Sequence, residues 1–220
     1  MQVKLVVDAA IVVDLVFLVD ESDSVNLHWD IVLSFIEDIV SDMDIGDTAA
    51  RVGFIKFGDR ADNVFDLDAY SDREDLLEAI ADVSYDGGSE TNTQEALAEM
   101  HTDQFKDDRG DRADAANVVI LLADGESSID PENTIPEAEE ARRKGIDILT
   151  IGIGPDANAA ELRLMSSEPH HLDENYFMLS SFGALSSIAD TIRARITEIA
   201  EGRPNFKRGD GHIFVLPRSF

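Results

Sequence analysis

The sequence contains no cysteine, so disulfides, thiolate metal sites and cysteine nucleophiles are excluded. Basic residues are also scarce, with 18 Lys and Arg against 46 Asp and Glu and a net charge of −28. A chain with this charge repels nucleic acids and anionic membrane surfaces. No run reaches the roughly 18 apolar residues that a membrane-spanning helix needs. We therefore expect neither a nucleic-acid partner nor a membrane partner.

The length and apolar content predict one large folded domain, because 220 residues with 44% hydrophobic content can bury a sizeable core. The apolar start from Met1 to Asp20 carries three charged residues and no cleavage signature, so it does not read as a signal peptide. The excess of acid attracts cations, divalent cations most strongly. Three explanations of this acidic excess are open. The protein is an acidic matrix protein in contact with calcium, or it comes from a halophile and uses the acids to hold a hydration shell, or the acids simply keep its surface soluble.

Short apolar runs alternate with longer amphipathic ones along the chain. Asp14 to Asp20 and Asn117 to Asp124 are continuous apolar runs that end in aspartate, as expected of strands buried on both faces. Further strands are expected over 51–57, 63–67, 147–152 and 176–179, and helices over 29–40, 93–101, 134–144, from 158 and over 185–199. A capping box, Ser71 to Glu74, predicts one more helix. This alternation predicts an α/β domain, doubly wound, with a mostly parallel central sheet flanked by helices on both faces.

The two ends of the chain are predicted to be extensions of a central domain over residues 14–200. The N-terminal extension covers residues 1–13 and contains a strand-like run, Val3 to Val7. The C-terminal extension covers residues 201–220, and its run from Gly211 to Leu216 predicts a possible extra strand.

Three polar segments are predicted to meet at one edge of the sheet, because ligands of such folds bind at the carboxyl ends of the strands near the switch in strand order. The apolar run that ends at Asp20 leads into Asp20-Glu-Ser22-Asp-Ser24, and the run that ends at Asp124 leads into Asp124-Gly-Glu. Between them, a glycine-rich segment, Gly87 to Thr93, precedes a helix. These segments supply carboxylate and hydroxyl oxygens with no His or Cys, which suits Mg²⁺, Mn²⁺ or Ca²⁺ better than zinc or copper.

Each segment alone is a weak indication of a metal site, because Asp and Ser are ordinary residues of turns and helix caps. Their joint occurrence, in order and at strand ends, predicts a metal site formed by Asp20, Ser22, Ser24, Thr91 and Asp124. Only two of these side chains carry a formal charge. A divalent ion held there keeps Lewis acidity and an open position for a carboxylate from another molecule.

The sequence resembles the von Willebrand factor type A domain over roughly Asp14 to Ala200. The resemblance is carried by the three segments above and supported by Arg51-Val-Gly-Phe-Ile-Lys-Phe57 and Ile151-Gly-Ile-Gly154. It is strongest to the extracellular matrix branch, as in matrilins, type VI collagen chains and mollusc byssal or shell matrix proteins. It implies a metal-ion-dependent adhesion site in which the serines and Thr91 give hydroxyl oxygens and the two aspartates bind directly or through water. Thr91 is implied to exchange between direct and water-mediated contact as ligand binds.

The chain departs from this family's pattern beside the site. Ser89-Glu90 replaces one of the small residues that often precede the threonine, so Glu90 adds an acid there. Glu21 and Asp23 add two more. We expect these acids to strengthen cation binding and to weaken capture of an acidic ligand.

Three classes of function follow. The first is a metal-dependent adhesion module, secreted into the extracellular matrix, that binds collagen or another matrix protein through an acidic residue of the partner. The second is an acidic matrix protein that binds calcium or calcium carbonate. The third, an enzyme, is not expected, because haloacid-type hydrolases need a second Asp where this chain has Ser22 and no nucleophile-elbow motif is present.

Two Arg-Gly-Asp tripeptides, Arg109 to Asp111 and Arg208 to Asp210, raise the alternative of an integrin ligand. Such a tripeptide also recurs by chance in a chain rich in Arg and Asp, and both copies are expected in exposed polar loops.

Overall fold

The computed structural model describes residues 11–202. The strands expected at Val3 to Val7 and at Gly211 to Leu216 lie outside the described residues, as does the second Arg-Gly-Asp tripeptide. Within residues 11–202, no helix combines the length and the apolar character needed to cross a membrane.

A six-stranded sheet forms the centre of the domain, with the strand order β3-β2-β1-β4-β5-β6. All neighbouring strands are parallel except β3, which runs antiparallel to β2. The strands are β1 (Val13–Asp20), β2 (Ala50–Phe57), β3 (Ala61–Phe65), β4 (Ala116–Ala123), β5 (Ile146–Ile153) and β6 (Tyr176–Leu179). The predicted doubly wound, mostly parallel sheet is therefore confirmed.

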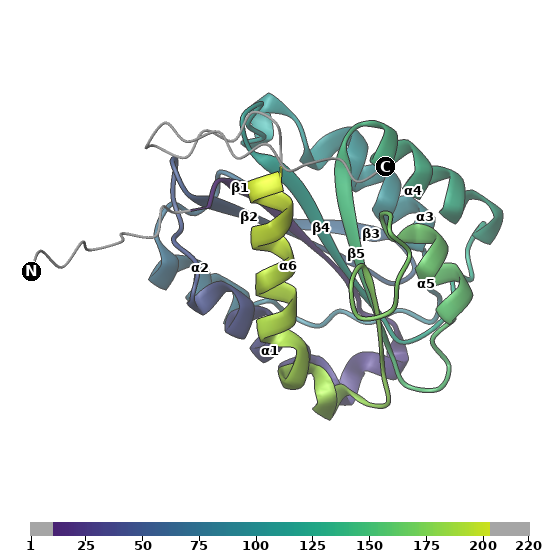
Figure 1. The fold of residues 1–220 in the computed structure, drawn as a ribbon. Helices are drawn as coiled ribbons and strands as arrows, with labels where there is room; N and C mark the ends of the chain where they lie inside the picture. Colours follow the sequence, from purple (N-terminus) through teal and green to yellow (C-terminus); the bar gives the residue numbers. More distant parts are fainter. Residues whose placement is uncertain (1–10, 203–220) are drawn as a thin grey trace, which may run out of the picture.

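Helices cover both faces of this sheet (Figure 1). One face carries α1 (Trp29–Ser41), α2 (Arg73–Ala81) and α6 (Ala189–Gly202), and the other carries α3 (Thr93–Glu99), α4 (Thr134–Arg143) and α5 (Ala159–Met165). Each face has its own apolar cluster. The continuous apolar run of β1 serves both clusters, because Phe17 and Val19 face one side while Val16 and Leu18 face the other.

Several local details differ from the sequence predictions. The cap of α2 is Asp72, whose carboxylate accepts hydrogen bonds from the backbone N–H groups of Glu74 and Asp75, whereas the prediction gave that role to Ser71. The helix expected to reach residue 101 ends as α3 at Glu99 and continues as a π-helical turn, Met100–Gln104. The third strand begins at Ala61 and not at Asn63, because the chain reverses directly after β2.

The strand order reverses between β1 and β4, which are neighbours in the centre of the sheet. The chain leaves β1 towards β2 on one side and leaves β4 towards β5 on the other. The loops that follow β1 and β4 therefore diverge at the carboxyl ends of these strands, which is where ligands of such sheets bind. Asp20 ends β1 and Asp124 directly follows β4, so both aspartates are at this switch point.

Candidate metal centre

Four of the five predicted metal ligands form one hydrogen-bonded group. The backbone N–H of Ser22 donates to Asp20 Oδ1 over 2.8 Å, which folds the segment after β1 back over its last residue. The hydroxyls of Ser22 and Ser24 lie 3.2 Å apart. The hydroxyl of Ser24 then donates to Asp124 Oδ1 over 2.9 Å. The loops after β1 and β4 are thus joined through their own side chains.

Thr91, the fifth predicted ligand, is held at the same edge through backbone contacts. Its N–H donates to Ser128 Oγ over 2.8 Å, and its carbonyl accepts from the N–H of Ser128 over 3.0 Å. Ser128 belongs to the loop that follows Asp124, so Thr91 is attached to that loop. Its side chain is almost fully buried. No hydrogen bond among the described residues joins the Thr91 hydroxyl to the other four ligands.

The glycines before Thr91 are required by close packing of two loops. A Cβ on Gly88 would lie 2.8 Å from the backbone nitrogen of Asp59 and 3.0 Å from the Cα of Gly58. Gly87 has a φ of +82°, which side chains other than hydrogen rarely allow. The carbonyl of Gly88 accepts from the N–H of Asp23 over 2.8 Å, so this loop also contacts the segment after β1.

Asp20 is in the environment expected of a metal ligand. Its residue is only 2% exposed, and burial raises the pKa of its carboxyl to about 6. Its second carboxylate oxygen, Oδ2, is buried and has no hydrogen-bond partner among residues 11–202. Burial also raises the pKa of Asp124. A cation at this place would give the orphaned oxygen a partner and favour the ionised form of both carboxyls.

The donor set fits a hard cation, since it offers two carboxylates and three hydroxyls and no nitrogen or sulfur. In residues 11–202, no group of three or more His, Cys, Asp and Glu side chains is placed to hold a metal ion. Any site built from Asp20 and Asp124 therefore depends on the hydroxyls to complete its ligands.

Lys56 is a residue that sequence reasoning missed. Its ammonium lies 3.2 Å from Glu21 Oε2 and 2.6 Å from Asp86 Oδ2, and only 3% of its side chain is exposed. Burial opposes its charge, but the hydrogen bond to Asp86 and the charge of Glu21 outweigh burial and raise the pKa of Lys56. Lys56 is therefore shared by two carboxylates, and Glu21 is not an exposed acid but is buried against a lysine of β2. The three charges sum to −1, so the expectation that acids beside the site strengthen cation binding stays a prediction.

Glu90 has a more specific contact than its position in the sequence predicts. Its Oε2 accepts from the hydroxyl of Ser128 over 2.7 Å, and the same hydroxyl accepts from the N–H of Thr91. The backbone N–H of Glu90 donates to Asp59 Oδ1 over 2.9 Å. Glu90 therefore orients the residue that holds Thr91. Neither Ser128 nor Asp59 carries a motif that could have marked it in the sequence.

The tripeptide Arg109 to Asp111 is bound into the domain. The Arg109 guanidinium pairs with Asp66 over 2.8 Å and with Asp103 over 2.7 Å. Asp111 Oδ1 accepts from the side-chain amide of Asn117 over 2.8 Å. An integrin that recognises this tripeptide would have to break these contacts, which weakens the integrin-ligand hypothesis for this copy.

The sequence matches the model of a known protein family. The model of the von Willebrand factor type A domain matches residues 14–191. The chain belongs to this family. As expected of a VWA domain, it carries the Asp20 and Asp124 loops at the switch point of its sheet. The resemblance seen in the sequence is thus confirmed.

Relatives of this VWA domain include adhesion and matrix proteins. The transmembrane cell adhesion receptor mua-3 of Caenorhabditis elegans is 36% identical over 94% of the chain and 5% of its own length. Matrilin-1 of Bos taurus is 31% identical over 83% of the chain and 32% of its own length. The collagen alpha-6(VI) chain of Homo sapiens is 31% identical over 84% of the chain and 8% of its own length. The VWA domain thus spans less than a third of each of these relatives.

Solved structures show the same fold. One structure of proximal thread matrix protein 1 from the mussel byssus has a TM-score of 0.76 and 28% identity, over 89% of this chain and 48% of that one. Another structure of that protein, described as having a zinc-occupied MIDAS motif, has a TM-score of 0.78 and 21% identity, over 85% of this chain and 49% of that one.

Proposed function

We propose that this VWA domain is a binding module, without enzymatic activity, of a secreted extracellular matrix protein, and that it captures a carboxylate of collagen or another matrix protein through a divalent cation. The cation, Mg²⁺ by preference and otherwise Mn²⁺ or Ca²⁺, is held by Asp20, Ser22, Ser24, Thr91 and Asp124. The observation that carries this proposal is the buried Asp20 Oδ2, which lacks any partner among the described residues. An oxygen in that position is unfavourable unless a cation or a proton accompanies it.

The electrostatics of the site support capture of a carboxylate. Two carboxylates balance the charge of one divalent ion without exceeding it, and Glu21 nearby is paired with Lys56. Ser24, one of the five proposed ligands, is exposed, so an ion bound to its hydroxyl lies at the surface. A partner's carboxylate can reach the ion there. The names of the relatives, a cell adhesion receptor, a matrilin and a collagen chain, support a matrix or adhesion setting.

The test compares Asp124→Ala with Asp114→Ala in the full chain. Asp114 is an exposed acid near the start of β4, at the other end of that strand from Asp124, so its loss is a matched control. Binding to immobilised collagens is measured in Mg²⁺ and in EDTA, together with the melting temperature. We expect Asp124→Ala and EDTA to abolish binding and the Mg²⁺-dependent rise in melting temperature, while Asp114→Ala retains both. Cation-independent binding, or full binding by Asp124→Ala, would overturn the proposal.

The net charge of −28 favours a second candidate, an acidic matrix protein that binds calcium or calcium carbonate through its surface. Adsorption to calcium carbonate crystals separates the two functions. Adsorption that Asp124→Ala leaves unchanged, with no collagen binding by the parent chain, would favour the mineral-binding function.

A further inference from the structure

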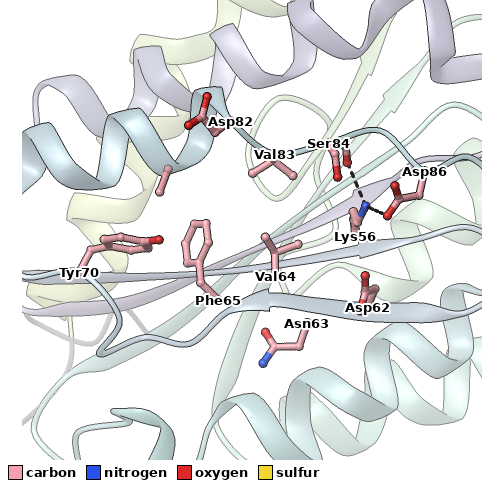
Figure 2. A pocket seen from close by; sticks show the side chains of 11 residues that line it. Lys56, Asp62, Asn63, Val64, Phe65, Tyr70, Asp82, Val83, Ser84 and Asp86 are labelled. Atoms are coloured by element: carbon pink, nitrogen blue, oxygen red, sulfur yellow. Dashed lines mark hydrogen bonds and ion pairs between the residues drawn. The ribbon is translucent and has the colours of Figure 1, made fainter.

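An open groove lies between β3 and α2, on the sheet face that also carries α1 and α6 (Figure 2). Its volume is about 460 Å³. Apolar side chains of Val64, Phe65 and Val83 line its middle, and Tyr70 lies at one end. Asp62 and Asp86 lie at the other end, and Asp82 lies on the α2 side. A groove of this size accepts several side chains of an extended polypeptide.

β3 is an edge strand, since it is the last in the strand order and pairs only with β2. The backbone N–H of Ala61 donates to Glu95 Oε2 over 3.2 Å, so this residue directs its backbone groups away from β2. Asn63, two residues further on and still before the register shift that leaves Val64 without a partner in β2, directs its own groups the same way. Apart from the β2–β3 pairing, no hydrogen bond within residues 11–202 involves the backbone of Asn63. One N–H and one C=O are therefore available to a further strand.

The groove favours a basic occupant. Neither the Asp62 nor the Asp82 carboxylate has a hydrogen-bond or ion-pair partner among the described residues. Asp86 is paired, but its partner Lys56 is shared with Glu21, so the three charges of that group still sum to −1. A second copy of this chain would bring the same acids to the groove, at a net charge of −28 for each chain, and would be repelled.

The side chains of β3 define the pattern of the occupant. Asp62 and Val64 point to the groove side of the strand, while Asn63 points to the opposite side (Figure 2). Val64 is 36% exposed, so its side chain is accessible to a residue of an added strand. Residues facing them on an added strand would also be two positions apart. A lysine or arginine would face Asp62 and an apolar residue would face Val64.

We propose that the groove beside β3 is a second docking site, which takes an extended segment of a partner protein that carries a basic and an apolar residue two positions apart. The segment adds to the sheet as a strand through the backbone of Asn63. Backbone hydrogen bonds contribute affinity for any extended segment, whatever its sequence. Asp62, Asp82 and Val64 select segments with the basic and apolar residues described above. This docking requires no metal ion, so it is independent of the site at Asp20 and Asp124.

The probe is a blocked peptide, acetyl-Gly-Lys-Val-Lys-Val-Lys-Gly-amide, titrated into the full chain in EDTA and followed by NMR of the backbone amides. We expect the Asn63 amide to shift and its hydrogen exchange to slow. Asp62→Asn with Asp82→Asn should weaken the Kd by roughly five- to tenfold, since two exposed charge pairs are removed. The matched control, Glu132→Gln with Glu139→Gln, removes two exposed acids near α4 on the opposite face and should leave the Kd unchanged.

Two further peptides test the mode of binding. A peptide with Glu in place of each Lys should not bind, and N-methylation of the central residues should weaken binding by removing backbone donors. An equal Kd for the two double variants would overturn the proposal, because it would show unspecific attraction to an acidic surface. An unchanged Asn63 amide at saturation would also overturn it, as would binding that needs Mg²⁺. Amide spectra of both variants show whether each remains folded.

Discussion

Lys56 and Glu21 form a buried ion pair directly beside the candidate metal centre. Lys56 comes from β2 and Glu21 follows Asp20, the last residue of β1, and 3% and 6% of their side chains are exposed. The lysine also bonds to Asp86, which precedes the Gly87-Gly88 loop. One ammonium thus joins the segment after β1 to the segment that leads to Thr91. Lys56, which is not part of the predicted metal-binding motif, therefore holds together two segments of the candidate metal centre.

Replacing Lys56 by methionine should destabilise the domain by about 3 kcal/mol, because it leaves the Glu21 carboxylate buried without a counter-charge. The double variant Lys56→Met with Glu21→Gln should recover a large part of this loss, since no buried charge remains. Urea denaturation of the four proteins of this double-mutant cycle measures the coupling. Additive effects of the two substitutions would contradict the pairing.

Ser128→Ala should weaken Mg²⁺ binding by about tenfold, because partners that orient a metal ligand commonly contribute that much to affinity. The substitution removes the hydroxyl that accepts from Thr91 N–H and donates to Glu90. Ser187→Ala is the matched control, since it removes an exposed serine hydroxyl that donates to the carbonyl of Ala184. Calorimetric titration with Mg²⁺ distinguishes them. Equal affinities would mean that Thr91 does not depend on Ser128.

The stability of the metal-free domain should depend on pH through Asp20. Its folded-state pKa is about 6 against an ordinary 3.8, so between these values the folded chain holds a proton that the unfolded chain has lost. The free energy of unfolding in EDTA should therefore fall as pH rises from about 4 to about 6, with Asp20 contributing on the order of 2–3 kcal/mol. Asp124, whose pKa is also raised by burial, contributes in the same direction.

Urea denaturation of the parent and of Asp20→Asn at pH 4.5 and pH 7 isolates this contribution, because all other carboxyls are common to both. The parent should lose more stability than the variant between the two pH values. Saturating Mg²⁺ should reverse the trend in the parent, because the cation binds the ionised carboxylate. A variant with the same pH dependence as the parent would contradict the assigned pKa shift.

Monovalent salt should raise the melting temperature, since the net charge of −28 repels itself more in the compact state than in the unfolded chain. The Debye length falls from about 10 Å at 0.1 M to about 3 Å at 1 M. Salt therefore screens the repulsion between most pairs of exposed carboxylates. Mg²⁺ at matched ionic strength should add roughly 2.7 kcal/mol at 100 times its Kd. Melting curves of Asp20→Asn should retain the NaCl effect and lose the Mg²⁺ effect. A melting temperature that does not change with NaCl would mean that the acids are already well spaced or paired.

The sequence by itself predicted the sheet, which the structure confirms, and the proposed ligand set, because both predictions depend on local patterns. The apolar runs that became β1 and β4 each end in aspartate, and the chain order of the Asp20, Thr91 and Asp124 segments places them at one edge of any doubly wound sheet. Helical periodicity likewise predicted α1, since the helix expected over residues 29–40 is observed as Trp29–Ser41.

Only the tertiary structure decided which distant side chains pair with one another. The ion pair of Glu21 with Lys56 and the hydrogen bonds of Thr91 with Ser128 join residues 35 and 37 positions apart. The enclosure of Arg109 by Asp66 and Asp103 and the edge position of β3 likewise follow from strand order and loop packing. In a chain with 46 acidic residues, composition cannot tell which acid meets one of the few bases. That choice depends on distances that exist only after the strands have been ordered and the loops packed.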